Sequence, residues 1–303
     1  MKRVAVVVVF FLILGTALGA LYRSQRRPED SGVSPNAILN LAADVQRDLS
    51  RVPMHFSRLS DEEEICIGNE LANRYISKLP RFTAQEEALQ AYAQRVGGRV
   101  ATRAHRRLPY TFHLLPYDAL INAFSLPGGH VFVGEGMMNK MTTEDELANV
   151  LGHEIEHVDH YHCVERVQIE AQLRNFHLEI VGAVLQIPLE VWERGYNKDQ
   201  EMEADREGMR VAVLAGYSPY GAITLFEKLA EMEKEYGIHA QTPEQELSEL
   251  ARQSLEGYFR SHPQTSERLA QAKNLIAQEH WENRNQQKAF HIEYEVHNGA
   301  FVK

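Results

Sequence analysis

The segment from Thr143 to His157 constrains the fold of this chain more than any other part of the sequence. Thr143 is followed three residues later by Glu146, which is the capping-box spacing typical of the first turn of a helix. Further along, the same helix carries the motif His-Glu-Ile-Glu-His, which begins at His153. At about 100° per residue, His153 and His157 lie on one helix face, so both imidazole rings can reach one metal ion. We therefore expect a helix that starts just after Thr143, runs past Arg166 and carries a metal site.

Carboxylates complete this predicted site. Glu154 lies about 100° from His153 around the helix, beside the metal rather than on it, where it can act as a general base toward a water held by the metal. Two histidines and a water leave a zinc ion one protein ligand short, and Glu201, on a second predicted helix, is the best candidate for that ligand. Asp205, one helical turn after Glu201, can accept the free ring N–H of a ligand histidine and fix its tautomer.

Nearby polar side chains receive a different interpretation. In the metzincin pattern a glycine at position 160 turns the chain and a histidine at position 163 binds the metal, but this sequence has His160 and Cys163 there. We therefore expect the helix to continue, with His160 as a polar residue beside the site. Glu203 lies at about 200° from Glu201 around its helix and is expected to be a surface or packing carboxylate.

The composition excludes several other classes of protein. The 303 residues include 32 Lys and Arg against 42 Asp and Glu, a formal charge of −10, which argues against a nucleic-acid binder. The two cysteines, Cys66 and Cys163, cannot form a disulfide framework or a cysteine-based zinc module. Spacing alone leaves open whether they pair with each other.

The rest of the chain is mostly helical, with one β-rich region. Capping boxes at Ser60 and Thr83 predict two helices, and the alternating pattern over residues 110–133 predicts about three strands with a tight turn at Pro127–Gly129. The apolar stretch Ile180–Val191 contains a proline and is expected to be a buried, kinked helix. Further helices are predicted at about 173–192, 200–214, 219–236, 243–258 and 265–280. We expect one α+β domain, mostly helical, with the edge strand of a small β-sheet facing the helix that carries the metal site.

An apolar run without charged residues extends from Val4 to Tyr22. It is long enough to cross a bilayer as a helix, and with its basic start and small residues at Ala17, Gly19 and Ala20 it also resembles a secretory signal. A retained membrane anchor and a cleaved signal peptide both place the rest of the chain outside the cytoplasm. The expected division is 1–22 for this segment, 23–58 for a linker with a short helix, 59–281 for the main domain and 282–303 for a C-terminal tail.

The order of these motifs resembles that of the gluzincin metallopeptidases of the HtpX and CAAX prenyl protease type, which include the periplasmic β-barrel assembly-enhancing protease. The resemblance covers roughly residues 59–272. The segments that carry it are Glu64-Ile-Cys-Ile-Gly68, Asn122-Ala-Phe-Ser-Leu-Pro-Gly-Gly129, Glu201-Met-Glu-Ala-Asp205-Arg206-Glu-Gly208, Gly216-Tyr-Ser-Pro219, and Ser261-His-Pro263 with Glu267-Arg268. The residues to which it assigns roles are His153, His157 and Glu201 as ligands of one Zn²⁺, Glu154 as general base and Asp205 as support of a ligand histidine. His162 also matches a family histidine, but on a continuous helix it lies on the opposite face and is expected to pack.

The resemblance also implies substrate contacts. A peptide can add to an exposed sheet edge through main-chain hydrogen bonds, and the resemblance implies backbone contacts from Ala123 and a side-chain contact from Asn122. An ordinary core strand is the alternative. His262 is expected near the metal, where it either stabilises the developing oxyanion or occupies the open metal position; a capping or surface histidine is the alternative. Arg268 is expected to orient a carboxylate in the site.

Together these features predict a zinc-dependent metalloendopeptidase that hydrolyses peptide bonds without a covalent intermediate. The expected substrates are polypeptides, such as misfolded proteins of the cell envelope, by analogy with the family. The alternative is a non-catalytic, zinc-stabilised chaperone-like or assembly factor that binds peptides on the edge strand. Processing of prenylated proteins is a weaker possibility, because the related prenyl protease encloses its site with several membrane spans and this chain has at most one candidate span.

Overall fold

The structure is a computed structural model and describes residues 59–166, 196–235, 262 and 265–290. Several predicted segments lie outside the described residues: the apolar run at 4–22, the linker at 23–58, the helices at 173–192 (with its apolar stretch at 180–191) and 243–258, and the tail beyond residue 290. Among the helices that are described, none is both long and apolar enough to cross a membrane.

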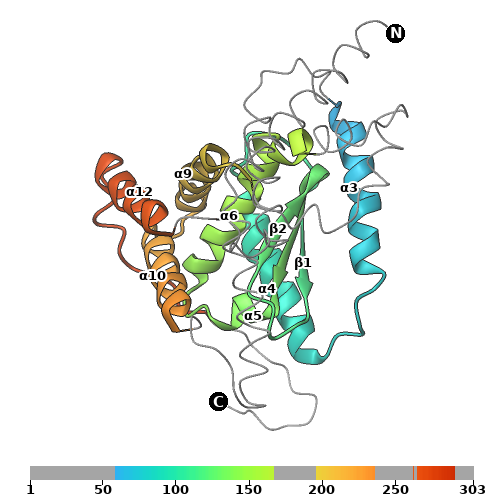
Figure 1. The fold of residues 1–303 in the computed structure, drawn as a ribbon, viewed down its shortest axis with the longest axis horizontal. Coiled ribbons are helices and arrows are strands. Elements are labelled where there is room, and N and C mark those ends of the chain that lie inside the picture. Colours follow the sequence, from blue (N-terminus) through green and yellow to red (C-terminus); the bar gives the residue numbers. More distant parts are fainter. Residues whose placement is uncertain (1–58, 167–195, 236–261, 263–264, 291–303) are drawn as a thin grey trace, which may run out of the picture. The chain divides into compact units, whose positions relative to one another are not determined.

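The described elements are mainly helices, with three short strands between them (Figure 1). In chain order they are α3 (Asp61–Ile76), α4 (Ala84–Ala101), β1 (Thr111–Leu115), β2 (Ala123–Leu126), the 3-10 turn η1 (Pro127–Gly129), β3 (His130–Gly134), α5 (Glu135–Asn139), α6 (Glu144–Asp159), α9 (Lys198–Leu214), α10 (Tyr220–Glu235) and α12 (Thr265–Gln278). This confirms the predicted α+β fold, mostly helical with a small sheet.

The three strands form a mixed sheet in the order β1-β3-β2. Strand β3 pairs parallel with β1 and antiparallel with β2, so β2 lies at one edge of the described sheet. The turn η1 joins β2 to β3, and Gly128 and Gly129 have φ angles of 77° and 97°, which only glycine adopts without strain. The predicted strands and the tight turn are therefore confirmed.

Both faces of the sheet are buried. Because alternate side chains of a strand point to opposite sides, the strands contribute to two separate hydrophobic clusters. Phe112, Leu114 and Val131 belong to the core that α4 and α6 cover. Phe124 and Phe132 face the other way, toward a second cluster that includes Ile67 and Leu71 of α3; their rings stack with centroids 5.1 Å apart.

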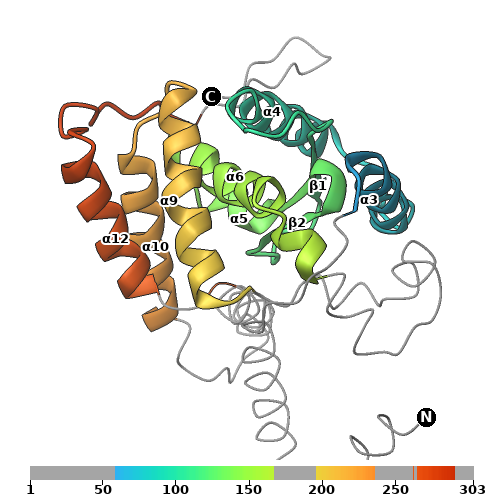
Figure 2. The ribbon, with the colours of Figure 1, turned by 90° about the horizontal axis from the view of Figure 1, so that it is seen from above.

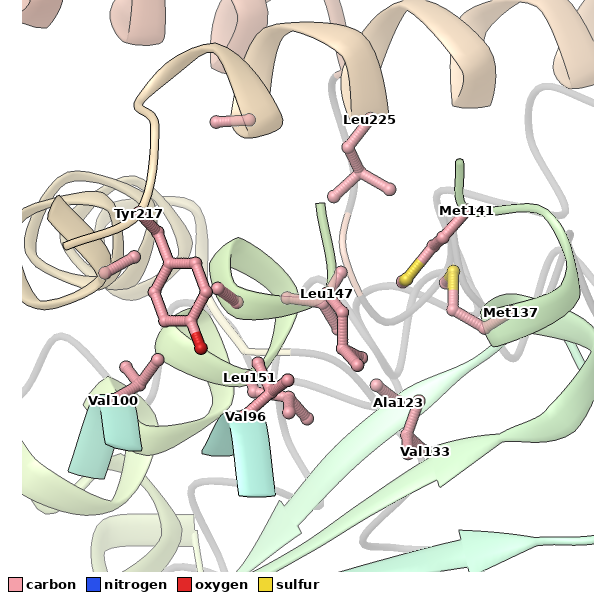
Figure 3. Packing of buried hydrophobic residues seen from close by; sticks show 14 of the residues in the cluster. Val96, Val100, Ala123, Val133, Met137, Met141, Leu147, Leu151, Tyr217 and Leu225 are labelled. Atoms are coloured by element: carbon pink, nitrogen blue, oxygen red, sulfur yellow. The ribbon is translucent and has the colours of Figure 1, made fainter. Parts of the chain in front are cut away.

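Helix α6 is the central element of the described residues. Figure 2 shows it between the sheet with α4 on one side and the helices α9, α10 and α12 on the other. Figure 3 shows Leu147 and Leu151 of α6 surrounded by side chains from both sides, including Val96 of α4, Val133 of β3 and Leu225 of α10. A helix buried all round in this way holds polar side chains in fixed positions, because each must find a partner inside the protein.

The predicted starts of three helices are confirmed by capping boxes. The side chains of Ser60, Thr83 and Thr143 each accept the backbone N–H three residues later, and the glutamate at that position bonds back. The predicted end of α6 is wrong, however. The helix ends at Asp159, and Tyr161 has a φ of 62°, so the chain turns before a new helical segment at 162–166. The turn occurs without the glycine that we considered necessary, and it redirects every residue after Asp159.

Candidate metal centre

Two buried histidines on α6 point their Nε2 atoms toward one position. The Nε2 atoms of His153 and His157 are 3.0 Å apart, as expected for residues separated by one helical turn. Glu201 reaches the same position from α9: one carboxylate oxygen is 3.4 Å from Nε2 of His153 and the other is 3.5 Å from Nε2 of His157. With His262, these residues form a buried group in which one ligand atom from each lies within 4.8 Å of the others. Such a group could hold a metal ion.

A pair of glycines sets the distance between the two helices that carry these ligands. A Cβ atom on Gly208 of α9 would lie 2.6 Å from the backbone nitrogen of His153, and one on Gly152 of α6 would lie 2.6 Å from the carbonyl oxygen of Gly208. The two helices therefore touch backbone to backbone one residue before His153. Our sequence reasoning gave these glycines no role; glycine inside two predicted helices was the available signal.

Asp205 holds the other ring nitrogen of His153. Its Oδ1 is 2.8 Å from Nδ1 of His153, and Arg268 from α12 holds both of its oxygens at 2.6 Å. In the neutral ring, donation from Nδ1 to Asp205 leaves the Nε2 lone pair of His153 for a metal. Burial opposes the charge on Asp205, but Arg268 and His153 lower the pKa of this carboxyl overall. The structure thus places Asp205 against a ring nitrogen of His153 and Arg268 against Asp205.

His157 is held in a different way. Its ring lies flat against Tyr196, with centroids 3.8 Å apart, and its Nδ1 is 3.0 Å from Nδ1 of His162. The prediction that His162 lies on the opposite face and only packs is wrong, because the turn at Tyr161 brings it back beside His157. Burial is the largest cause that holds the pKa of His157 well below its usual value, which favours the neutral ring that a metal requires.

His262 lies inside the buried group rather than on the surface or at a helix end. Its Nδ1 is 2.8 Å from a carboxylate oxygen of Glu201 and 3.3 Å from Nε2 of His153. Its Nε2 is 3.7 Å from Oε1 of Glu154. Burial alone would raise the pKa of Glu201. The charge of His262, together with the hydrogen bonds that Glu201 makes to His153 and His262, lowers this pKa well below its usual value.

Glu154 is buried beside the group and does not belong to it. Within the described residues its Oε2 atom is buried and has no hydrogen-bond partner, and the same holds for Oε1 of Glu201. A buried carboxylate oxygen without a donor is costly, so these two atoms indicate that a cation or a proton donor belongs at this position.

The remaining predicted residues lie outside the buried group. Asn122 precedes β2 and its carbonyl accepts the N–H of Gly134, so by the alternation of an antiparallel pair the backbone of Ala123 faces away from β3. The side chain of Asn122 accepts the N–H of Ala123 at 2.9 Å. His160 contacts Glu156 at 3.1 Å and is not part of the group, as expected.

The two cysteines are free. Cys66 is exposed and Cys163 is buried, so the pairing that spacing left open does not occur. The thiol of Cys163 lies 3.1 Å from the hydroxyl of Tyr196, the residue whose ring covers His157.

A helix with two histidines one turn apart, a carboxylate from a second helix beside them and a buried glutamate next to the first histidine is the arrangement of the zincin class of metallopeptidases. Comparison with known proteins agrees with this class. The chain belongs to peptidase family M48, whose family model matches residues 86–276, more than half of the chain.

Named relatives fall into two groups. The chain is 27% identical over 242 residues to the beta-barrel assembly-enhancing protease of Escherichia coli (strain K12), an alignment that covers 73% of this chain and 45% of that protein. It is 28% identical over 176 residues to the mitochondrial metalloendopeptidase OMA1 of Bos taurus, an alignment that covers 52% of this chain and 31% of that protein. It is 30% identical over 164 residues to the mitochondrial metalloendopeptidase OMA1 of Schizosaccharomyces pombe, an alignment that covers 48% of this chain and 45% of that protein. This chain thus aligns with less than half the length of each of these relatives.

Proposed function

We propose that this chain is a zinc metalloendopeptidase that hydrolyses peptide bonds in proteins. The observation that carries the proposal is the convergence of three potential ligands, from His153, His157 and Glu201, beside the buried carboxylate of Glu154. Two imidazole nitrogens and a carboxylate oxygen are ligands that Zn²⁺ takes in catalytic sites, where a further position is left for water or substrate. The family supports the same activity, since its members are named as peptidases.

Each residue then has a distinct role. His153, His157 and Glu201 would hold the metal, which when bound polarises a carbonyl group and makes a water molecule acidic near neutral pH. Glu154 accepts the proton of the attacking water and delivers it to the leaving amine. Asp205, held by Arg268, keeps His153 in the tautomer that leaves Nε2 free.

The edge strand β2 is the proposed docking site for the substrate backbone. The main-chain groups of Ala123 face away from β3, and α6 packs beside the same strand. All four residues of β2 are buried, so this proposal requires the edge to open before an extended peptide pairs with Ala123. The side chain of Asn122 now bonds to the N–H of Ala123, so in this proposal it exchanges that bond for a contact with the peptide.

His262 is proposed to occupy the open metal position in the conformation seen here. One of its nitrogens lies within the potential ligand group, which favours this role over oxyanion stabilisation. A peptide carbonyl could then approach only after His262 moves away, so the fraction of molecules with His262 displaced would limit the rate of digestion.

We further propose that the protein acts outside the cytoplasm on misfolded envelope proteins. This rests on the apolar run at 4–22, which would serve as a signal or an anchor, and on the name of the Escherichia coli relative, a beta-barrel assembly-enhancing protease.

Metal-dependent proteolysis tests the activity. The full-length protein should bind about one zinc ion per chain and digest an unfolded protein such as casein. A chelator should stop the digestion, and added zinc should restore it. Zinc binding without digestion, including by a His262→Ala variant, would favour the alternative of a non-catalytic, zinc-stabilised chaperone-like factor.

A further inference from the structure

The two histidines on α6 have different supports, although they are one turn apart. The Nδ1 of His153 faces a carboxylate, Asp205, which a buried arginine holds. The Nδ1 of His157 faces another histidine, His162, at 3.0 Å. His162 must therefore supply what a carboxylate supplies to His153, and an imidazole can do so only in one of its two tautomers.

Counting protons fixes that tautomer. For Nε2 of His157 to offer its lone pair to a metal, the ring proton must sit on Nδ1. Two Nδ1 atoms 3.0 Å apart can share one proton but cannot both carry one, so Nδ1 of His162 accepts the bond. The proton of His162 then resides on its Nε2 atom.

The carboxylate of Glu203 lies within ion-pair distance of that nitrogen. Its Oε2 is 3.4 Å from Nε2 of His162, and its Oε1 is 3.6 Å from Nδ1 of His160. Glu203 is 38% exposed while His162 is 4% exposed, so the series His157, His162, Glu203 leads from the buried group to the surface. His162 can reach both His157 and Glu203 because α6 ends at Asp159 and the chain turns at Tyr161, which has a left-handed conformation.

We propose that His162 is a positioning residue for His157, and that Glu203 in turn fixes the tautomer of His162. Together they keep the proton of His157 on Nδ1 and its Nε2 lone pair directed into the metal site. The inference rests on the proposed function only in requiring that the site binds a metal ion. It does not require proteolysis.

Metal affinity tests the inference directly. Zinc alone is titrated against a chromophoric chelator of known affinity, with the full-length wild-type protein and four variants. His162→Phe keeps a ring and removes the acceptor, whereas His162→Asn places an amide oxygen near the position of Nδ1. Glu203→Gln removes the charge at the surface end. Glu207→Gln makes the same charge change one turn later on α9. Glu207 pairs with Arg206 and Arg210, and Arg206 also lies 3.8 Å from Glu203, so both variants lose a contact with this arginine but only Glu203→Gln removes the charge beside His162.

The expected result is a graded loss. His162→Phe should bind zinc about 10- to 100-fold more weakly, the usual effect of removing the partner of a ligand histidine. Glu203→Gln should show a smaller loss of up to about tenfold. His162→Asn should recover most of the affinity, and Glu207→Gln should bind zinc as the wild type does.

A double variant separates positioning from general damage to the fold. If Glu203 acts through His162, adding Glu203→Gln to His162→Phe should cause no further loss, whereas independent structural effects would add. If His162→Phe does not fold, as judged by its circular dichroism and thermal transition without metal, the surface variant Glu203→Gln alone decides. Unchanged affinity in Glu203→Gln, or equal losses in Glu203→Gln and Glu207→Gln, would overturn the inference while leaving the proposed function intact. Failure of the wild type to bind zinc would instead contradict the proposed function.

Discussion

Arg268 shows how much of the site depends on a side chain that touches no metal ligand atom. Its guanidinium holds both oxygens of Asp205 at 2.6 Å and lies 4.8 Å above the ring of Phe226, almost entirely buried. If the arginine is removed, Asp205 remains as a buried charge whose only partner among the described residues is His153. That situation costs more than the ion pair itself contributes.

Arg268→Met should therefore lower the free energy of unfolding by about 3–5 kcal/mol, measured by urea denaturation of the metal-free protein. Arg210→Met is the matched control on α9, because Arg210 pairs with Glu207 and Glu279 near the surface and should cost at most about 1 kcal/mol. Equal losses in the two variants would contradict the importance assigned to the buried pair.

His262 permits a second prediction at the scale of one residue. If its ring occupies the open metal position, His262→Ala should digest casein faster than the wild type while still binding zinc through His153, His157 and Glu201. If the ring stabilises the oxyanion instead, the same variant should digest casein more slowly, by roughly 10²- to 10³-fold. The initial rate of digestion, normalised to bound zinc, distinguishes the two roles.

A third prediction concerns two histidines on the sheet, far along the chain from α6. Nε2 of His113 is 3.1 Å from Nδ1 of His130, and burial followed by the nearby charge of His130 lowers the pKa of His113 to about 4. In the unfolded chain a histidine titrates near 6.5, so between pH 6.5 and 4 the unfolded state binds more protons. The native state should therefore lose stability as the pH falls through this window, and His113→Phe should reduce that loss. Unfolding by urea at pH 7 and at pH 5 measures both slopes, and an unchanged slope in the variant would contradict the assignment.

At the scale of elements, the crossing of α6 and α9 decides whether a metal site exists. The backbone contact through Gly152 and Gly208 brings Glu201 within reach of both histidines. A methyl group at position 208 must push the helices apart, because its neighbours are backbone atoms that cannot rotate away.

Gly208→Ala should therefore destabilise the protein by about 1–3 kcal/mol and weaken zinc binding as well. Gly98→Ala in α4 is the control, since the nearest atom to a Cβ there is a flexible glutamine nitrogen at 3.9 Å. That substitution should stabilise the helix by about 0.5–1 kcal/mol and leave zinc affinity unchanged. Thermal unfolding and chelator competition measure both quantities, and an unperturbed site in Gly208→Ala would refute the close-contact argument.

The elements also show which parts of the fold could be predicted from sequence. Helix starts at Ser60, Thr83 and Thr143 were predictable because a capping box is local chemistry between residues three apart. The end of α6 was not predictable, because the left-handed conformation there belongs to Tyr161 and not to a glycine, the residue that usually marks such a position. The contact between His162 and His157 depends on that turn, so the sequence did not predict this contact either. Convergence of Glu201 on the histidines was anticipated from motif order, but the glycine contact that produces it belongs to tertiary packing.

At the scale of the whole molecule, the described residues hold one potential metal group, and it lies at the junction of the helical layer and the sheet. Helix α6 belongs to both: its ligand face meets α9, while its other faces pack against α4 and the strands. The edge strand β2 lies beside the same helix, and in the proposed function it would hold an extended peptide near the metal.

The central claim is that Glu154 acts on a water molecule and takes no part in holding the metal. The most direct measurement compares wild type and Glu154→Gln in the full-length protein, for zinc content and for the rate of casein digestion. We expect the variant to retain about one zinc ion per chain and to digest casein about 10²- to 10⁴-fold more slowly. Proteolysis at the wild-type rate by the variant, with or without bound zinc, would contradict it.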